Sequence, residues 1–214
     1  MSNRQAFSLI ELAIILTIIA ILTASVTFAQ KLIKKNQLNR LIAEVKLYHA
    51  DMHVFRLKYN AHAGDYSKAG LVWGNDCNGL TSGSDLCSGD GNDIIAEAAT
   101  NEMVNAWAHI YKAQINNNNY PFSSTVNWQD NVPASALENG SLYLFASGQK
   151  GLILELRSRD DEYGAISHLD AYQIDNKIDD GILAKGNVYG ACGAGVVTYD
   201  LDFGDFLVCG LKFK

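Results

Sequence analysis

The side chains that could bind a transition metal are few, and they are spread along the sequence. The five histidines are His49, His53, His62, His109 and His168. His49 and His53 are four residues apart, so both could ligate one ion from the same face of a helix, but no H-E-x-x-H motif is present. Exposure of this face to solvent explains the spacing more simply. We therefore expect no zinc site.

Nucleophilic catalysis has no better support. Ser147 lies in the stretch ASGQ, which lacks the G-x-S-x-G pattern of a nucleophile elbow. The cysteines are better explained as disulfides than as nucleophiles. The glycine-rich stretch SGDGN at 88–92 is too far from the P-loop pattern to indicate nucleotide binding. The sequence therefore predicts that the protein is not an enzyme.

Two acidic clusters offer the hard oxygen ligands that calcium prefers. Their members are Asp85, Asp90 and Asp93, which alternate with glycines, and Asp175, Asp179 and Asp180. Neither cluster matches the loop of an EF-hand. Most such clusters are helix ends and solvated turns, so we expect no cofactor, with calcium as the alternative.

The four cysteines form two local pairs, and neither pair has the C-x2-C spacing of a zinc site. Three pairings into two disulfides are possible, and the short separations favour Cys77 with Cys87 and Cys192 with Cys209. Disulfides would place the domain in an oxidising compartment such as the periplasm. The alternative is four buried free thiols in a cytosolic protein.

The formal net charge of −6 argues against nucleic acid as a partner, because binding phosphates requires clustered basic residues. The clustered bases that exist follow an apolar run and are Lys31, Lys34, Lys35 and Arg40. Bases in this position more often meet lipid headgroups or solvent. We expect no nucleic-acid partner.

The apolar run covers residues 7–29, and Glu11 is its only formal charge. As a helix it would be about 34 Å long, which matches the thickness of a bilayer core. A cleaved secretory signal has a shorter apolar core, so this segment is more simply explained as a retained transmembrane helix. The bases that follow it favour a cytoplasmic C-terminal domain, whereas cysteine pairing favours a periplasmic one. We give the cysteines more weight.

The residues from Arg4 to Leu12, RQAFSLIEL, resemble the leader junction of type IV pilins and type II secretion pseudopilins. The resemblance implies a leader at 1–6 that the prepilin peptidase removes between Ala6 and Phe7, followed by N-methylation of Phe7. The residue before the cut is usually Gly in this family, and here it is Ala6. A second departure is the absence of a proline from the transmembrane helix.

The same resemblance implies a reason for Glu11. A carboxylate in hydrocarbon costs roughly 2.5 to 3.5 kcal/mol on insertion scales. In the family it pairs with the first amine of a neighbouring subunit, here that of Phe7, in an ion pair that a low dielectric strengthens. A pair within one chain is an alternative, since the two residues are four apart. Another alternative is that the Glu11 side chain only extends to the membrane–water interface and has no specific partner.

The segment 30–59 continues the helix as an amphipathic half. Its apolar stripe recurs at steps of three and four: Leu38, Leu41, Val45, Tyr48, Met52, Phe55 and Tyr59. The polar residues Lys46, Asp51, Arg56 and Lys58 fall off this stripe. No proline precedes Pro121, so one helix could run from Phe7 to Tyr59. We expect the stripe to pack on a sheet, with a coiled coil as the alternative.

Residues 60–214 read as one globular domain of α+β class. Residues 75–93 are rich in Gly, Asn, Asp and Ser and indicate a loop closed by a disulfide. We expect helices at 93–115, capped by Asp93, and at 166–179, closed by Gly181. Strands are predicted at 141–146 and 151–156, which form a hairpin, and at 196–200 and 206–213. The antiparallel sheet would have about four strands, in a pilin-like layout.

These patterns together predict a filament subunit that works by assembly, a minor pilin or pseudopilin rather than a major pilin. It would be a single-pass protein of the inner membrane with a periplasmic domain, and would reach a filament or the cell surface after assembly. Its implied partners are the prepilin peptidase, other pilin-like subunits and an inner-membrane assembly platform. The alternatives are a membrane-anchored periplasmic binding or adhesion domain that does not polymerise, and a membrane-tethered enzyme.

Overall fold

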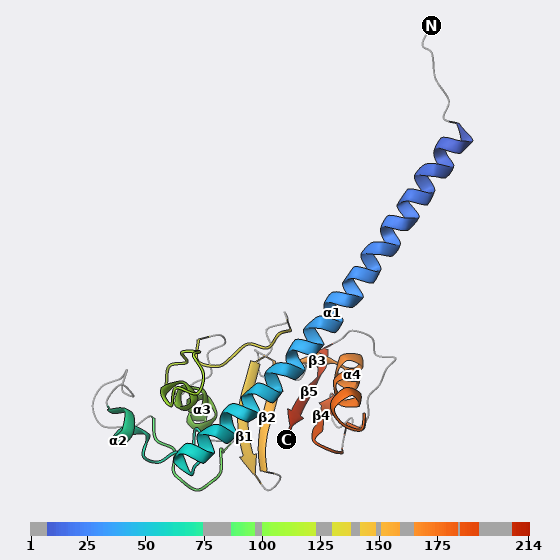
Figure 1. Cartoon of the computed structure of the whole chain (residues 1–214). Helices are drawn as coiled ribbons and strands as arrows, with labels where there is room; N and C mark the ends of the chain where they lie inside the picture. Colours follow the sequence, from blue (N-terminus) through green and yellow to red (C-terminus); the bar gives the residue numbers. More distant parts are fainter. Residues whose placement is uncertain are drawn as a thin grey trace. The chain divides into compact units, whose positions relative to one another are not determined.

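The computed structural model describes residues 8–74, 87–96, 100–122, 130–137, 142–148, 151–158, 165–183, 185–192 and 207–214. The chain divides into two compact units, residues 1–39 and 40–214. The helices are α1 (Leu9–Tyr59), α2 (Ala69–Trp73), α3 (Thr100–Lys112) and α4 (His168–Ile178) (Figure 1). The strands are β1 (Leu142–Gly148), β2 (Gly151–Arg157), β3 (Ile166–Ser167), β4 (Val188–Cys192) and β5 (Leu207–Phe213).

Helix α1 runs without interruption through 51 residues, as the absence of proline predicts. It begins at Leu9, and the predicted first residue, Phe7, lies outside the described residues. The helix ends where Asn60 adopts a left-handed backbone conformation, with φ of 52°. Asn tolerates this conformation and commonly terminates a helix in this way. The prediction of one long helix is confirmed.

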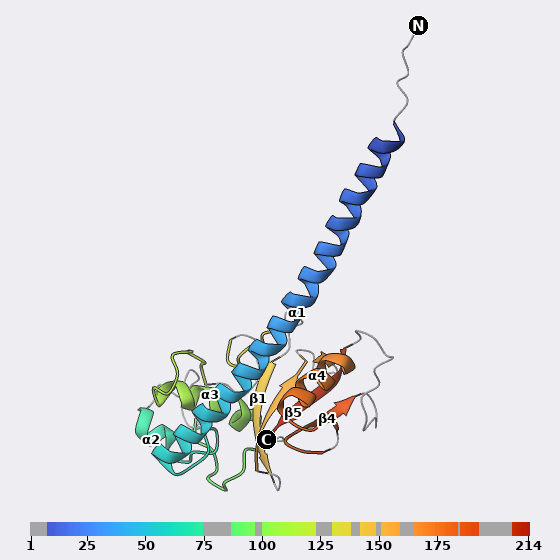
Figure 2. The same ribbon diagram turned by 45° about the vertical axis from the view of Figure 1, so that its right-hand side comes forward.

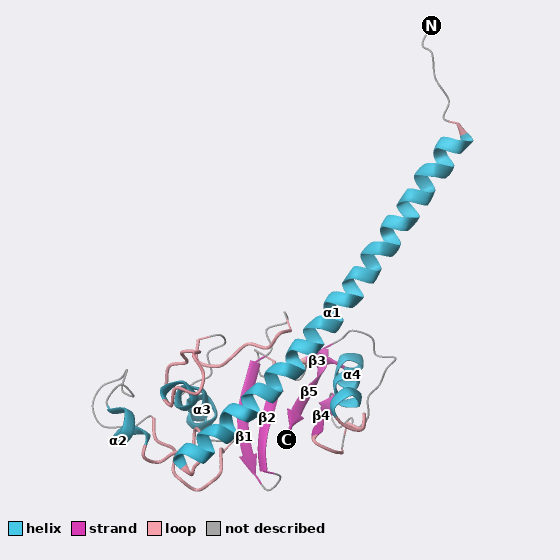
Figure 3. Ribbon diagram, viewed as in Figure 1, coloured by secondary structure: helices cyan, strands magenta, loops and turns pink. Residues whose placement is uncertain are grey.

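The sheet is antiparallel and has β5 at its centre (Figure 3). Lys212 of β5 lies opposite both Glu155 of β2 and Tyr189 of β4, so these two strands pair with opposite edges of β5. β1 extends the sheet beyond β2, with Gly148 opposite Gly151 at the hairpin end. β3 pairs with β5 at Ile166 and Cys209. The α+β class predicted from the sequence is confirmed.

One face of this sheet carries the core of the unit 40–214. Because side chains alternate along a strand, the register places seven apolar residues on this face: Tyr143, Phe145, Leu154, Leu156, Val188, Leu211 and Phe213, all buried. Helix α1 from Arg40 onward and helix α4 lie over it (Figures 1 and 2). The stripe from Leu41 to Phe55 is buried, as its spacing predicts.

Helix α3 joins α1 to the edge of the sheet through the buried Trp107. The indole ring meets Tyr48 of α1 edge to face, with ring centroids 4.8 Å apart, and contacts Phe145 of β1 at 4.6 Å. Its Nε1–H donates to the carbonyl oxygen of Tyr143 at 3.2 Å. The Tyr143 hydroxyl in turn donates to Glu44 of α1 at 2.9 Å. Three elements are thus held by one polar and aromatic cluster.

The start of α3 differs from the prediction. Asp93 does not cap the helix, because its backbone has a positive φ of 66° and its N–H donates to Asp65 Oδ2 at 2.8 Å. Residues 93–96 are loop, and the helix begins at Thr100. Val104, Trp107 and Ala108, which lie within the predicted helix, are nevertheless all buried.

The other elements agree with the predictions in part. The predicted hairpin is confirmed and consists of β1 and β2. The predicted last strand is confirmed as β5, which ends at Phe213. Helix α4 begins two residues late, after Ser167, whose side chain caps it by accepting from the Asp170 N–H at 3.2 Å. β3 and β4 were not predicted, and the strand expected at 196–200 lies outside the described residues.

A matched pair of substitutions in α1 tests the helix-on-sheet packing. Leu41 is fully buried, whereas Leu57 is 88% exposed. We expect Leu41→Ala to lower the free energy of unfolding by about 2 to 5 kcal/mol, because it leaves a cavity. Leu57→Ala should change it by less than about 0.5 kcal/mol. Urea unfolding of the full chain in detergent, followed by tryptophan fluorescence, measures both, and equal losses would contradict the packing described.

Candidate functional site

The first turn of α1 is closed by a reciprocal pair of side chains. The Ser8 backbone N–H donates to Glu11 Oε2 at 2.9 Å, and the Ile10 N–H donates to Ser8 Oγ at 3.4 Å. This S-x-x-E arrangement is a capping box, which satisfies N–H groups that have no partner within the helix. The S-x-x-E spacing is visible in the sequence, although the predicted roles of Glu11 did not include a cap.

The hydroxyl groups in the apolar half of α1 are all bonded to their own helix. Thr17 donates to the Ile14 carbonyl oxygen at 2.8 Å and Ser25 to that of Ile21 at 2.8 Å. Thr23 and Thr27 make equivalent bonds to carbonyls three or four residues earlier. A hydroxyl bonded in this way can lie in lipid without an unsatisfied donor.

The apolar half of α1 exposes its side chains within the single chain. Those from Leu9 to Phe28 are exposed on every face, including Leu12, Leu16, Ile19 and Leu22. In the described part of the chain, α1 is the one helix long and apolar enough to cross a membrane, with a mean hydropathy of 2.6 in its most apolar window. The helix fits a single-pass membrane protein.

Glu11 differs from every other polar group in this segment. Its Oε2 accepts the Ser8 N–H, but no described residue donates to Oε1. A carboxylate keeps several acceptor positions even with one hydrogen bond made. The predicted cleavage pair, Ala6 and Phe7, lies outside the described residues, so pairing of Glu11 with the Phe7 amine stays a prediction.

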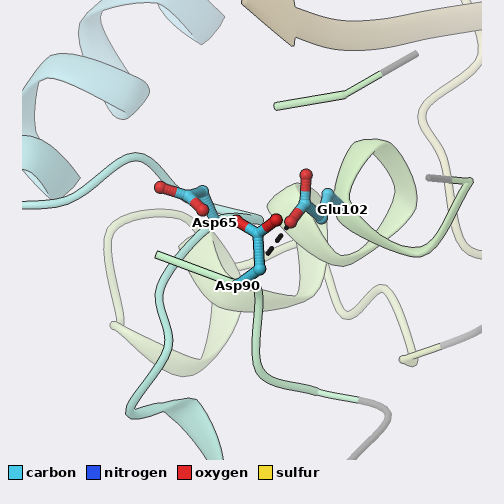
Figure 4. A group of neighbouring side chains, drawn as sticks. All are labelled: Asp65, Asp90 and Glu102. Carbon is cyan, nitrogen blue, oxygen red and sulfur yellow. Dashed lines mark hydrogen bonds between the residues drawn. The ribbon is translucent and has the colours of Figure 1, made fainter. Parts of the chain in front are cut away.

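A second group of acids lies in the unit 40–214, and it is not the one the sequence indicated. Asp65, Asp90 and Glu102 come together from a loop, a second loop and helix α3 (Figure 4). Asp65 and Glu102 are buried, and Asp90 is exposed. Asp85 of the predicted cluster lies outside the described residues. No spacing signal links Asp65 to Glu102, because the fold alone brings them together.

The two buried carboxylates hold the loop of residues 90–96 through its backbone. Asp65 accepts N–H bonds from Gly91 at 2.8 Å, Asn92 at 3.1 Å and Asp93 at 2.8 Å. Glu102 accepts from Asp90 at 3.3 Å and Ala96 at 3.0 Å. The amides of the glycine-rich stretch therefore bind a carboxylate of the chain itself, where a P-loop would bind phosphate.

The electrostatics and packing of this loop follow from its burial. Burial raises the pKa of the Asp65 carboxyl, and the neighbouring Asp90 carboxyl adds to the rise, while the N–H donors of Asp93 and Gly91 oppose it. Gly89 packs so closely that a Cβ there would lie 2.3 Å from the Asp65 Cα. Asp93 turns outward and pairs with Arg56 at 3.5 Å. The three carboxylates have the oxygen donors that a hard cation prefers.

The second predicted cluster does come together. Asp175, Asp179 and Asp180 lie at the end of α4, with Asp175 buried. Asp175 accepts the Gly181 N–H at 3.3 Å, and Asp179 accepts the N–H groups of Asn187 and Val188. These bonds close the helix end and fix the start of β4, which is a structural role.

Three of the five histidines have structural surroundings. His109 is buried, and its Nδ1 accepts the Gly64 N–H at 2.8 Å, so its Nε2–H donates to the Cys87 carbonyl oxygen at 2.7 Å. His62 Nε2 lies 2.9 Å from Arg56 Nη1, and burial lowers the pKa of His62. His168 is buried at the start of α4. His49 and His53 lie on α1.

The cysteines are described in part. Cys87 is buried and disulfide-bonded, but the predicted partner Cys77 lies outside the described residues. The backbones of Cys192 and Cys209 are directly opposite each other in the β4–β5 pair. Both pairings stay predictions. Ser147 lies within β1, opposite Leu152.

Comparison with known proteins yields one match. Residues 1–27 match the family model of the prokaryotic N-terminal methylation motif. No curated protein and no solved structure matches the chain.

The carboxylate-held loop can be tested with two neighbouring acids. Asp65→Ala should lower the free energy of unfolding by about 2 kcal/mol or more, because three backbone N–H groups lose their acceptor. Asp90→Ala, at an exposed position, should cost less than about 1 kcal/mol. Thermal unfolding of the full chain in detergent compares them. A smaller loss for Asp65→Ala than for Asp90→Ala would show that Asp65 does not hold the loop.

Proposed function

Because residues 1–27 carry the signature of type IV pilins and pseudopilins, we propose that the chain is a filament subunit assembled through its N-terminal helix. The proposed organisation is a leader at 1–6, a transmembrane helix at 7–29, the amphipathic half of that helix at 30–59 and a periplasmic domain at 60–214. The prepilin peptidase would cut between Ala6 and Phe7. Among such subunits we favour a minor pilin or pseudopilin.

One observation carries the proposal. In the apolar half of α1, every Ser and Thr hydroxyl is bonded to the helix backbone, whereas Glu11 has a carboxylate oxygen, Oε1, with no donor among the described residues. Leaving a charge unpaired in hydrocarbon is costly, whereas a new amine from an adjacent subunit would supply the missing partner. The exposed apolar side chains around it would be covered by lipid first and by neighbouring helices after assembly.

The capping role of Glu11 also bears on the alternative in which Glu11 pairs with the Phe7 amine of its own chain. Glu11 already reaches back to the Ser8 N–H to close the first turn. Its second oxygen remains available for an amine that comes from outside this turn. A subunit that never polymerised would have no use for a carboxylate oxygen that lacks a donor among the described residues, which disfavours the membrane-anchored domain as an alternative.

The proposed periplasmic location of the domain is argued from the cysteines. We propose disulfides between Cys77 and Cys87 and between Cys192 and Cys209. Directly opposed residues in antiparallel strands have Cα atoms about 4.5 to 5.5 Å apart, which lies within the range that a disulfide requires. The register of Cys192 and Cys209 therefore supports their pairing, and pairing supports an oxidising compartment.

The N-terminal mass of the mature protein tests the processing step. We expect material purified from the native membrane to begin with N-methylated Phe7, because the proposed cut lies directly before it. Top-down mass spectrometry measures this. Native protein that still begins with Met1 would exclude both processing and assembly through the Phe7 amine.

Substitution of Glu11 tests the role of the charge separately from the role of the cap. Glu11→Gln keeps an oxygen that can accept the Ser8 N–H but removes the charge. We expect membrane insertion to be retained and incorporation into filaments to fall about tenfold or more, since loss of one partner of a buried ion pair is costly. Quantitative immunoblotting of sheared filaments and of membranes measures both.

Ser8→Ala is the matched control for this experiment, because it removes the Ser8 Oγ that accepts the Ile10 N–H and leaves the charge of Glu11. It should weaken the first turn by about 1 kcal/mol and leave incorporation near the wild-type level. If Glu11→Gln assembled normally while Ser8→Ala did not, Glu11 would serve as a cap, and the ion-pair proposal would be wrong.

Peptide mapping without reduction tests the disulfides and the compartment together. We expect two linked peptide pairs, one containing Cys77 and Cys87 and one containing Cys192 and Cys209, because the paired residues are close in the chain or in register. Free thiols that react with an alkylating reagent in native material would instead place the domain in a reducing compartment.

A further inference from the structure

A cavity of about 360 Å³ opens beside α1 in the unit 40–214. None of the residues that line it belongs to the N-terminal segment proposed to act in assembly. Residues of α1, α4, β4 and β5 line it. Its floor is apolar, with Val45, Val188 and Phe213 buried or nearly so. Two imidazoles, those of His49 and His53, also line it. The sequence alone suggested only that both face solvent.

His49 is held in one tautomer. Its ring makes a hydrogen bond to the backbone of Phe213, while its Nε2 is buried without a hydrogen-bond partner. Since a backbone carbonyl accepts, the bond must come from Nδ1–H, and Nε2 carries the free lone pair.

This arrangement is the one that prepares a histidine to ligate a metal. In metal sites, the imidazole nitrogen that does not bind the ion donates its hydrogen to a carbonyl or carboxylate, which fixes the ring and the tautomer. The Phe213 backbone does this for His49. A buried nitrogen without a hydrogen-bond partner is costly, so its retention requires a reason.

His53 provides the second nitrogen. It is one helical turn after His49, on the same side of α1, and it lines the same cavity. The His53 side chain is exposed, and it makes no hydrogen bond within the described part of the chain, so it can rotate toward a shared ligand.

The other residues around the cavity select the kind of ion. No Asp or Glu is among the described residues that line it, and the charged side chains there are Lys46 and Lys214. Hard cations such as calcium and magnesium require oxygen ligands, whereas imidazole nitrogens suit zinc, copper and nickel. We propose that His49 and His53 together bind one divalent transition-metal ion in this cavity, with water in the remaining coordination positions.

Zinc binding by the full chain in detergent tests this proposal. After treatment with EDTA and dialysis, titration with ZnCl₂ should show one saturable site per chain by isothermal calorimetry. CaCl₂ and MgCl₂ should produce no heat at this site and should not compete. His49→Gln and His53→Gln should each weaken zinc binding by more than about tenfold, because each removes a ligand.

Lys46→Gln is the matched control, since it changes a residue of the same cavity wall that is not a ligand, and it should leave zinc binding intact or slightly tighter. Titration with CuCl₂ should yield an electron paramagnetic resonance spectrum with nitrogen coupling that is lost in His53→Gln. Because His53 is exposed, this variant should fold normally. Absence of a saturable site, or equal affinity in both histidine variants and wild type, would overturn the proposal.

Discussion

A helix segment that lies in hydrocarbon has to satisfy its polar groups from within, and the apolar half of α1 does so at every Ser and Thr hydroxyl but only in part at its one carboxylate, that of Glu11. Thr17, Thr23, Ser25 and Thr27 all donate to their own backbone. Glu11 contributes Oε2 to the cap of the first turn, and no described residue donates to its Oε1. In the proposed assembly, the amine of another subunit would pair with this carboxylate.

The unit 40–214 depends on a different use of carboxylates. Asp65 and Glu102 are buried, and each accepts backbone N–H groups of a loop that has no regular structure. His109 joins the same region by accepting from Gly64 and donating to Cys87, while its ring stacks on Phe55 of α1. A loop rich in glycine and aspartate thereby becomes fixed to α1 and α3 without secondary structure of its own.

The sequence predicted the elements that depend on a periodic pattern of residues. It failed where contacts between residues distant in the chain determine the local structure. The stripe from Leu41 to Phe55 and the hairpin between β1 and β2 were readable, because each pattern repeats over many residues. Asp93 was expected to cap a helix, but Asp65 holds its backbone in a loop. Asp51 was expected off the apolar stripe, yet it is buried and accepts from Asn116, so burial raises its pKa. The Ser8–Glu11 cap could have been predicted from its S-x-x-E spacing, but it was not.

The position of β5 has a consequence for how the unit forms. This strand, at residues 207–213, follows β1, β2, β3 and β4 in the chain but lies between β2 and β4 in the sheet. Until it has emerged, β2 and β4 have no common partner, and the sheet cannot close. Contacts this distant in sequence form slowly. The sheet of the unit 40–214 can therefore close only after nearly all of that unit has been synthesised, because its central strand is the last one in the chain.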